Sequence, residues 1–363
     1  MRFETTVSNL DILRTIAVSC VLGDHVLLFL TSHGEDPASH AISPLRLGRY
    51  GVLIFFVHTS LVLLMSLSRL VDQPFARRTV EFYTRRIFRI YPLVWLVVLL
   101  CVFARIPSSP AAKYVALDRL SLVSNLALVQ NLTHSLDVIT PLWSLPFEMQ
   151  MYLVLPVVFW SITRRSRFGA IALYYAAAAA IYIFGEKLGL RGGYLFRYVP
   201  CFLAGAVAFV LISTKRTSSG LPWWLWPALI AGVGAGFVFL PPLEEPAYSV
   251  AGWLACAWLG LSIPWFRPAT APLVVLPCKW IAQYSYGLYL FHLPVMWLVR
   301  NWLPHSGGIV RAPIALLLTA AVSFAVYHTL EAPMISLGRR LATRNEMRES
   351  PAPNPVLSTP VLS

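Results

Sequence analysis

Charged residues are scarce in this 363-residue chain, and their scarcity excludes an ordinary soluble domain. Only 12% of the residues are Asp, Glu, Lys or Arg, against roughly 25% in soluble domains. Hydrophobic residues make up 57% of the chain, so a soluble protein of this composition would have too few polar residues to cover its apolar core. The composition therefore predicts an integral membrane protein.

Nucleotide-binding and metal-binding signatures are also missing. The sequence contains no P-loop and no Rossmann glycine fingerprint. The five cysteines lie singly in or beside apolar stretches, without the spacing of metal ligands, so we interpret them as small buried residues. The first apolar stretch contains Arg14 and Asp24 and precedes no A-x-A site, which argues against a cleaved signal peptide. Any chemistry is therefore expected from the membrane helices, without a bound metal.

Apolar runs long enough to cross a bilayer are abundant. Crossing about 30 Å of hydrocarbon requires about 20 residues in a helix. Such runs occur at 10–30, 49–68, 86–104, 142–161, 168–185, 194–213, 222–240, 247–265, 280–300 and 312–332. The segment 115–132 is shorter and more polar, and we expect an amphipathic surface piece or a re-entrant piece there. The predicted fold class is an all-α integral membrane protein with about ten transmembrane helices.

The distribution of basic residues predicts the orientation. With the N-terminus inside, the inner connections and the C-terminal tail carry 17 Lys and Arg residues, and the outer connections carry nine. Both termini are therefore expected in the cytoplasm. The net charge of +13 follows from this topology, so we expect no nucleic-acid partner. We expect one membrane domain over 1–340 and a disordered cytoplasmic tail over 341–363, the end of which is rich in Pro and Ser.

Ionisable side chains inside the predicted spans are the candidates for chemistry. Arg14 and His25 are eleven residues apart, which places them on one helical face about 16 Å apart. Glu148, His58 and His292 also fall in the middle or outer half of the bilayer. A single intramembrane histidine can be a structural hydrogen-bond partner, and we favour that role for His58. For His25 and Glu148 we predict a general base and the carboxylate that orients it. A metal site is disfavoured, because paired ligands on one helix usually lie three or four residues apart.

Arginines gather at the expected cytoplasmic entrance of the third span. In FYTRRIFRIYP, Arg86 and Arg89 share a helical face beside Arg85. Each of these residues alone could serve only as a positive-inside anchor. Together, their guanidinium groups can hold phosphates bidentately, so we predict a docking site for a phosphate-bearing donor. The arm of such a donor would extend past Arg14 towards His25.

These residues belong to motifs that resemble one family, the membrane-bound acyltransferase 3 proteins, over residues 8–340. Five motifs occur in the family's order: a first-span Arg and His, a Gly–Phe second span, an arginine motif, a Trp–Ser–Leu–Glu motif and a ninth-span motif. The matching residues include Arg14, His25, Gly51, Phe55, Phe56, Arg85, Arg86, Arg89, Trp143, Ser144, Glu148, Tyr152, Ser285, Tyr289, His292 and Glu331. The second span departs from the family pattern at Leu53, His58, Thr59 and Ser60.

The resemblance implies a multi-pass O-acyltransferase of the cell inner membrane. Such an enzyme takes an acyl group, most often acetyl, from cytoplasmic acyl-CoA and needs no tightly bound cofactor. The implied acceptor is a hydroxyl of an envelope or extracellular glycan or of its lipid-linked precursor, and other glycan-assembly proteins are expected partners. Small secondary metabolites such as macrolides are an alternative acceptor class. A non-enzymatic transporter of lipid-linked sugars is a further alternative, although we see no internal repeat between the halves of the chain.

The resemblance also suggests roles for individual residues. His25 would deprotonate the acceptor hydroxyl or carry the acyl group itself, with Glu148 orienting it. Arg14, Arg85, Arg86 and Arg89 would bind the donor. Support or acceptor contacts are expected from His58, Trp143, Ser144, Tyr152, Tyr289 and His292.

Overall fold

Apolar runs form helices because a helix satisfies its own backbone hydrogen bonds, which the hydrocarbon interior of a bilayer cannot do. The computed structural model describes residues 7–31, 46–164, 167–185, 195–214, 220–241 and 243–349. Its helices are α1 (Val7–Thr31), α2 (Leu47–Ser68), α3 (Phe75–Phe103), α4 (Arg119–Ala127), α5 (Gln130–Thr133), η3 (Thr140–Ser144), α6 (Leu145–Arg164), α7 (Arg167–Phe184), α8 (Val199–Thr214), α9 (Leu225–Val238), α10 (Ala247–Ser262), η4 (Ile263–Trp265), α11 (Pro272–Trp302), α12 (Gly308–Val326), η5 (Tyr327–Glu331) and α13 (Ala332–Glu349).

Seven helical segments in the described ranges are long and apolar enough to cross a membrane. They comprise α1, α2, α3, η3 with α6, α7, α10 with η4, and α12 continued into α13. The protein is therefore an all-α, multi-pass membrane protein. Each of the ten expected spans falls on a helix. However, α8 and α9 have only 16 and 14 residues, and the longer α11 carries several polar side chains. The number of crossings and the orientation of the termini remain predictions.

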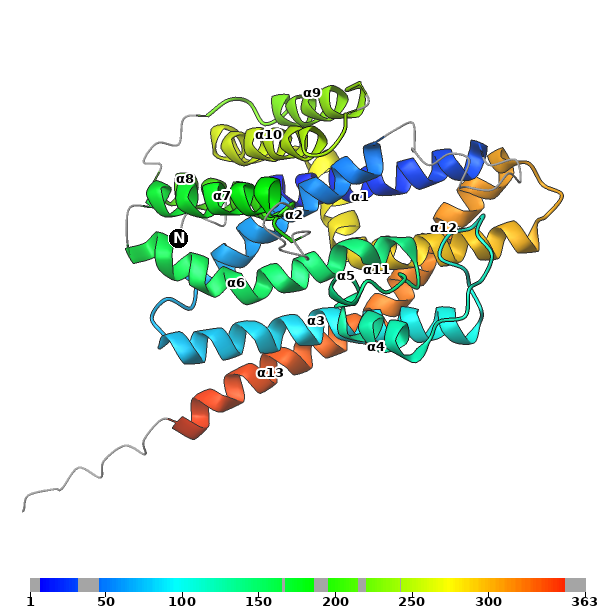
Figure 1. The fold of residues 1–363 in the computed structure, drawn as a ribbon, viewed down its shortest axis with the longest axis horizontal. Coiled ribbons are helices and arrows are strands. Elements are labelled where there is room, and N and C mark those ends of the chain that lie inside the picture. Colours follow the sequence, from blue (N-terminus) through cyan, green and yellow to red (C-terminus); the bar gives the residue numbers. More distant parts are fainter. Residues whose placement is uncertain are drawn as a thin grey trace, which may run out of the picture.

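Helix α2 lies at the centre of the bundle and packs against α1, α6, α8, α9 and α10. In Figure 1, α9 and α10 lie along one edge of the bundle, and α3 with α13 lie along the opposite edge. Close packing around α2 depends on glycine. A Cβ on Gly51 would lie 2.5 Å from the carbonyl oxygen of Ala17, and a Cβ on Gly205 would overlap the carbonyl oxygen of Val57. Small residues of this kind let membrane helices approach closely.

The segment expected to be an amphipathic or re-entrant piece, 115–132, contains two short helices, α4 and α5. The side chain of Asn125 holds the following loop. Its amide nitrogen donates to the carbonyl oxygen of Leu136 at 2.8 Å, and its amide oxygen accepts from the backbone N–H of Val138 at 3.0 Å. Residues 130–137 are thereby fixed beside the start of α6.

The C-terminal helix crosses the boundary expected between membrane domain and tail. Helix α13 runs to Glu349, so the part of the expected tail from 341 to 349 is helical, and 350–363 lie outside the described residues. Helix α13 packs against α3 before this segment, where Gly338 lets the two helices approach so closely that a Cβ there would lie 2.6 Å from that of Phe88. Between α12 and α13, the chain makes one wide π-turn, η5.

Candidate active site

A cavity of about 190 Å³, here called the arginine cavity, lies where α1, α2, α3, α6 and α11 meet. Eight of the twelve side chains predicted for the site line it: Arg14, His58, Arg86, Arg89, Ser144, Glu148, Tyr152 and Tyr289. Thr59, Ser285 and Tyr286 also line this cavity, although we did not predict them as site residues. These five helices, together with η3, which carries Ser144, thus bring residues from most of the predicted motifs to one place.

Two hydroxyl groups fix the carboxylate of Glu148. Thr59 donates from Oγ1 to Glu148 Oε1 at 3.1 Å, and Tyr152 donates from its hydroxyl to the same oxygen at 2.5 Å. Tyr152 is one turn further along α6, as its i, i+4 spacing predicts. Thr59 comes from α2, and the only sequence signal for it is that it departs from the family pattern in the second span. These contacts orient Glu148 towards the arginine cavity.

Three guanidinium groups face this cavity without ion pairs in the described part of the chain: those of Arg14, Arg86 and Arg89. The Nε atoms of Arg14 and Arg86 are buried and have no hydrogen-bond partner. Glu148 is the carboxylate that the cavity wall supplies. Uncompensated charges away from water are costly, and guanidinium groups bind phosphate strongly through paired hydrogen bonds. The arrangement is therefore suited to an anionic ligand.

A second carboxylate, that of Glu331, lies behind the cavity wall. It sits on the π-turn η5, its side chain is only 2% exposed, and its Oε1 has no hydrogen-bond partner. It interacts electrostatically with Arg14 and Arg89. We did not predict Glu331 as a site residue, although a buried ionisable group inside a span is itself a signal of function. Single π-turns are also frequent at functional sites.

Arg85 is the member of the predicted donor cluster that does not line the cavity. It forms an ion pair with Glu81, one turn earlier on α3. Arg85 is only about 40° from Arg89 around the helix but about 100° from Arg86, and its guanidinium group is bound by Glu81 instead of lining the cavity. Its placement gives no support to a direct contact with the donor.

His25 lies against His292, on α11, with 4.9 Å between the ring centroids. The Nδ1 atom of His292 is 2.8 Å from the carbonyl oxygen of Tyr289 and 3.2 Å from that of Leu288. Because carbonyl oxygens only accept, Nδ1 carries the hydrogen and Nε2 keeps a lone pair. That Nε2 is buried and has no hydrogen-bond partner.

His25 and Glu148, which we predicted to be a base and its orienting carboxylate, have different neighbours in the structure. Glu148 is bound by Thr59 and Tyr152, whereas His25 contacts His292. The reason is the position of His25 on α1, which is three turns beyond Arg14, the residue that lines the cavity.

Tyr289 connects the histidine pair to the cavity. Its ring lies 6.3 Å from that of His292, centroid to centroid, and it also lines the arginine cavity. Its hydroxyl donates to the carbonyl oxygen of Pro141 at 2.9 Å and lies 2.8 Å from Ser144 Oγ, which is then the donor to Tyr289. Trp143, the remaining predicted residue, faces a different cavity, which is described below. Within the described ranges, no three His, Cys, Asp or Glu side chains form a group suited to a metal ion.

Comparisons with known proteins identify the family of the chain. Residues 7–328 match the acyltransferase 3 family model, which is described as an acyltransferase domain. The chain is also similar to the regulator of hypoxia-inducible factor 1 from Caenorhabditis elegans, with 23% identity over 368 residues that cover 81% of this chain and 70% of that protein. No solved structure matches the chain. The matched range includes the helices that supply every residue lining the arginine cavity, and the chain therefore belongs to the acyltransferase 3 family of membrane acyltransferases.

Proposed function

We propose that this protein is an O-acyltransferase of the cell inner membrane. It takes an acyl group, preferably acetyl, from cytoplasmic acyl-CoA and transfers it to a hydroxyl of an envelope or extracellular glycan or of its lipid-linked precursor. The observation that carries this proposal is the set of three cavity arginines that lack ion pairs among the described residues. Acyl-CoA combines phosphates, which such arginines bind, with a long arm that ends in a thioester.

The donor would enter beside Arg86 and Arg89 on α3, which approach the cavity from the expected cytoplasmic side. Arg14 lines the same cavity from α1 and would guide the arm. Binding one phosphate with several guanidinium groups requires that they converge, and the cavity supplies this convergence. Glu148, fixed by Thr59 and Tyr152, balances part of their charge when the donor is absent.

His25, supported by His292, would accept the proton of the acceptor hydroxyl or carry the acyl group. In direct transfer, the acceptor oxygen attacks the thioester carbonyl, the hydroxyl proton passes to a ring nitrogen of His25, and the C–S bond breaks to release CoA thiolate, which takes up a proton. In two-step transfer, His25 itself attacks the carbonyl, the C–S bond breaks and CoA leaves as a thiolate. The acceptor hydroxyl then attacks the acyl-imidazole, the C–N bond breaks to free His25, and the hydroxyl proton passes to the thiolate or to solvent. In both routes, His292 Nε2 can accept the N–H of His25, which would orient the opposite ring nitrogen towards the reacting carbonyl.

Mass spectrometry of envelope glycans tests the proposal most directly. We expect a strain lacking this protein to lose O-acyl groups that return on complementation with the parent chain but not with Arg86→Gln/Arg89→Gln. Purified protein in lipid nanodiscs should also move label from acetyl-CoA onto the extracted glycan. Identical glycans in the deletion and complemented strains would reject a glycan acceptor. Transfer of the label only to a small secondary metabolite would point to the other acceptor class.

A further inference from the structure

A second and larger cavity, here called the tryptophan cavity, has a volume of about 420 Å³. Arg49, near the start of α2, lines it together with Trp143, Phe147 and Tyr198. Helix α5 and the loop that follows it complete the wall with polar side chains, namely those of Gln130, Asn131, His134, Ser135 and Asp137. Ligand pockets usually enclose about 300–1,000 Å³, so the volume suits a small organic group.

The wall combines flat apolar surfaces with hydrogen-bonding groups. The ring centroid of Tyr198 lies 5.7 Å from that of Trp143 and 4.7 Å from that of Phe147. Amide, hydroxyl and carboxyl groups of residues 130–137 stand beside these rings. A pyranose ring has the matching chemistry, because its C–H face is apolar and packs on aromatic rings, while its hydroxyls need donors and acceptors around its edge.

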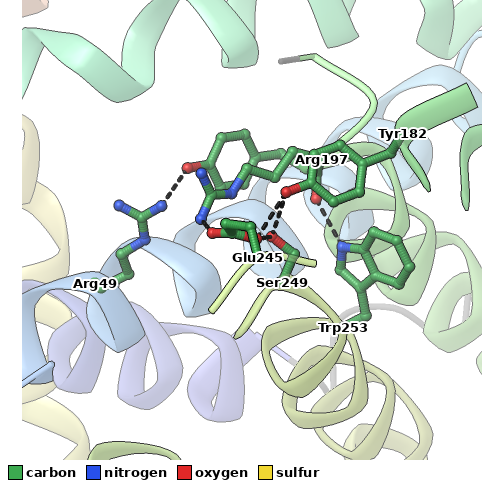
Figure 2. A network of polar contacts seen from close by, with 7 residues as sticks. Arg49, Tyr182, Arg197, Glu245, Ser249 and Trp253 are labelled. Atoms are coloured by element: carbon green, nitrogen blue, oxygen red, sulfur yellow. Dashed lines mark hydrogen bonds and ion pairs between the residues drawn. The ribbon is translucent and has the colours of Figure 1, made fainter. Parts of the chain in front are cut away.

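A network of polar contacts holds the charged part of this wall in place (Figure 2). Arg197, which also lines the tryptophan cavity, forms an ion pair with Glu245. Glu245 also accepts from Tyr182 at 2.7 Å and from Ser249 at 2.5 Å. Trp253 Nε1 donates to the backbone carbonyl of Arg197 at 2.7 Å. The charge of Arg197 is thus balanced, and its position is fixed before a ligand binds.

Arg49 differs from Arg197 in its contacts. It donates to the Tyr198 hydroxyl at 2.7 Å, and its guanidinium carbon lies 5.1 Å from the Trp143 ring centroid. It has no carboxylate partner among the residues that the structure describes. Of the five N–H donors of a guanidinium group, most therefore remain available to a ligand that packs on Trp143.

The two cavities share a wall. Ser144 and Glu148 line the arginine cavity, whereas their immediate neighbours Trp143 and Phe147 line the tryptophan cavity. Along α2, Arg49 and His58 are nine residues apart, which corresponds to about 14 Å in a helix. A group bound in the tryptophan cavity would therefore lie next to the wall of the arginine cavity, in which the thioester of the donor is proposed to bind.

We propose that the tryptophan cavity is the binding site for the acceptor, and that it binds a saccharide unit stacked on Trp143 and hydrogen-bonded by Arg49 and the polar residues of 130–137. The assignment rests on the proposed function and adds the place where the acceptor is held. A transferable hydroxyl of the bound unit would point across the shared wall towards the arginine cavity.

Saturation-transfer NMR on the full chain in nanodiscs tests the site without requiring turnover. The probes are the methyl glycosides of glucose, galactose, N-acetylglucosamine and glucuronic acid. At least one should show saturation transfer to its ring protons, and Trp143→Leu should weaken its binding about tenfold. Arg49→Gln is a second variant that keeps the aromatic wall. Trp258→Leu is the matched control, because Trp258 is 62% exposed and lines neither cavity.

Acetyl-CoA binding, measured on the same samples, separates the two proposals. We expect Trp143→Leu and Arg49→Gln to bind acetyl-CoA as the parent does and to melt at a similar temperature. Equal glycoside binding in the parent and both variants, or no glycoside binding by the parent, would overturn the acceptor site while leaving the donor site intact. If the parent chain did not bind acetyl-CoA at all, the proposed function would instead be rejected.

Discussion

His25 on α1 and His292 on α11 form a pair of imidazoles with 4.9 Å between their ring centroids. Because both described partners of His292 Nδ1 are carbonyl oxygens, its Nε2 is left as an acceptor beside His25. The pair therefore resembles a base and its orienting partner. His292 thus lies beside His25, where we had expected the carboxylate of Glu148.

Replacing His25 tests this arrangement. His25→Gln keeps a polar side chain but cannot take a proton near neutral pH, so we expect acyl transfer to fall about 10²–10⁴-fold, as it should in His25→Ala. His292→Gln should give a smaller loss, because it removes only the orienting contact. The measurement is acceptor acylation by membranes with matched protein levels. Transfer close to the parent rate in His25→Gln would show that His25 has only a structural role.

The donor site predicts a difference between neighbouring arginines. Arg86→Gln/Arg89→Gln should raise the KM for acyl-CoA by tenfold or more, since each charged hydrogen bond contributes about 1.5–3 kcal/mol. Arg85→Gln is the matched control, because Arg85 is paired with Glu81 outside the cavity. Its KM should stay within about twofold of the parent value. If Arg85→Gln raised the KM for acyl-CoA as much as Arg86→Gln/Arg89→Gln does, these arginines would act only through general positive charge.

The two hydroxyl contacts to Glu148 predict a graded effect. Thr59→Val and Tyr152→Phe each remove one hydrogen bond to Oε1 and leave the volume nearly unchanged. We expect each to lower kcat about tenfold, with the larger loss in Tyr152→Phe, which removes the shorter bond. Steady-state kinetics at saturating acyl-CoA measures this effect. Unchanged kcat in both variants would indicate that the orientation of Glu148 does not matter for transfer.

The fold was largely predictable because long apolar runs have few alternatives to helix in a bilayer. Every expected span lies on a helix, and the polar piece at 115–132 contains two short ones. Hydropathy does not determine how many helices cross, since the short α8 and α9 gain their burial from neighbours such as α2 and α10. The sequence pattern also did not predict that α13 continues to Glu349.

The candidate site was predictable where residues share one helical face. Glu148 with Tyr152, and Arg86 with Arg89, follow from their spacing, and all four line one cavity. The ion pair of Arg85 with Glu81 follows the same rule, because the two residues have an i, i+4 spacing on α3.

Contacts between distant helices were not predictable in this way. Thr59 beside Glu148, His292 beside His25 and Glu331 behind the cavity all depend on how the helices pack.

The loop carboxyl of Asp137 predicts a pH-dependent stability. Burial raises the pKa of Asp137 from 3.8 to about 6, although a hydrogen bond from Gln130 opposes the shift. Ionisation therefore costs more in the folded state, so the parent loses stability relative to Asp137→Asn as the pH rises from 4 to 6. We expect the variant to melt about 2 °C or more above the parent at pH 7.5. At pH 4 the two should melt together.

Asp118 provides the control for this prediction. Hydrogen bonds from Ser121 lower the pKa of Asp118, so its charged form is favoured in the folded state. Asp118→Asn should therefore gain no stability at pH 7.5. The same melting curves would contradict the account if both variants were stabilised equally.

The orientation of the chain can be tested with reporters. A cytoplasm-active reporter fused after residue 348 should be active, and a tag inserted between residues 31 and 47 should be labelled from outside, because basic residues concentrate on the inner side. A C-terminus labelled from outside would reverse the expected orientation of the chain. Arg86 and Arg89 would then face away from cytoplasmic acyl-CoA.

A single short stretch, from Trp143 to Glu148, supplies side chains to both cavities. A shift of this stretch that improves one binding site must alter the other. Thermodynamic linkage makes such coupling reciprocal: the factor by which one ligand changes the affinity of the second equals the factor by which the second changes that of the first. The ratio of the donor affinities measured with and without a bound saccharide would therefore give the coupling free energy between donor binding and acceptor binding.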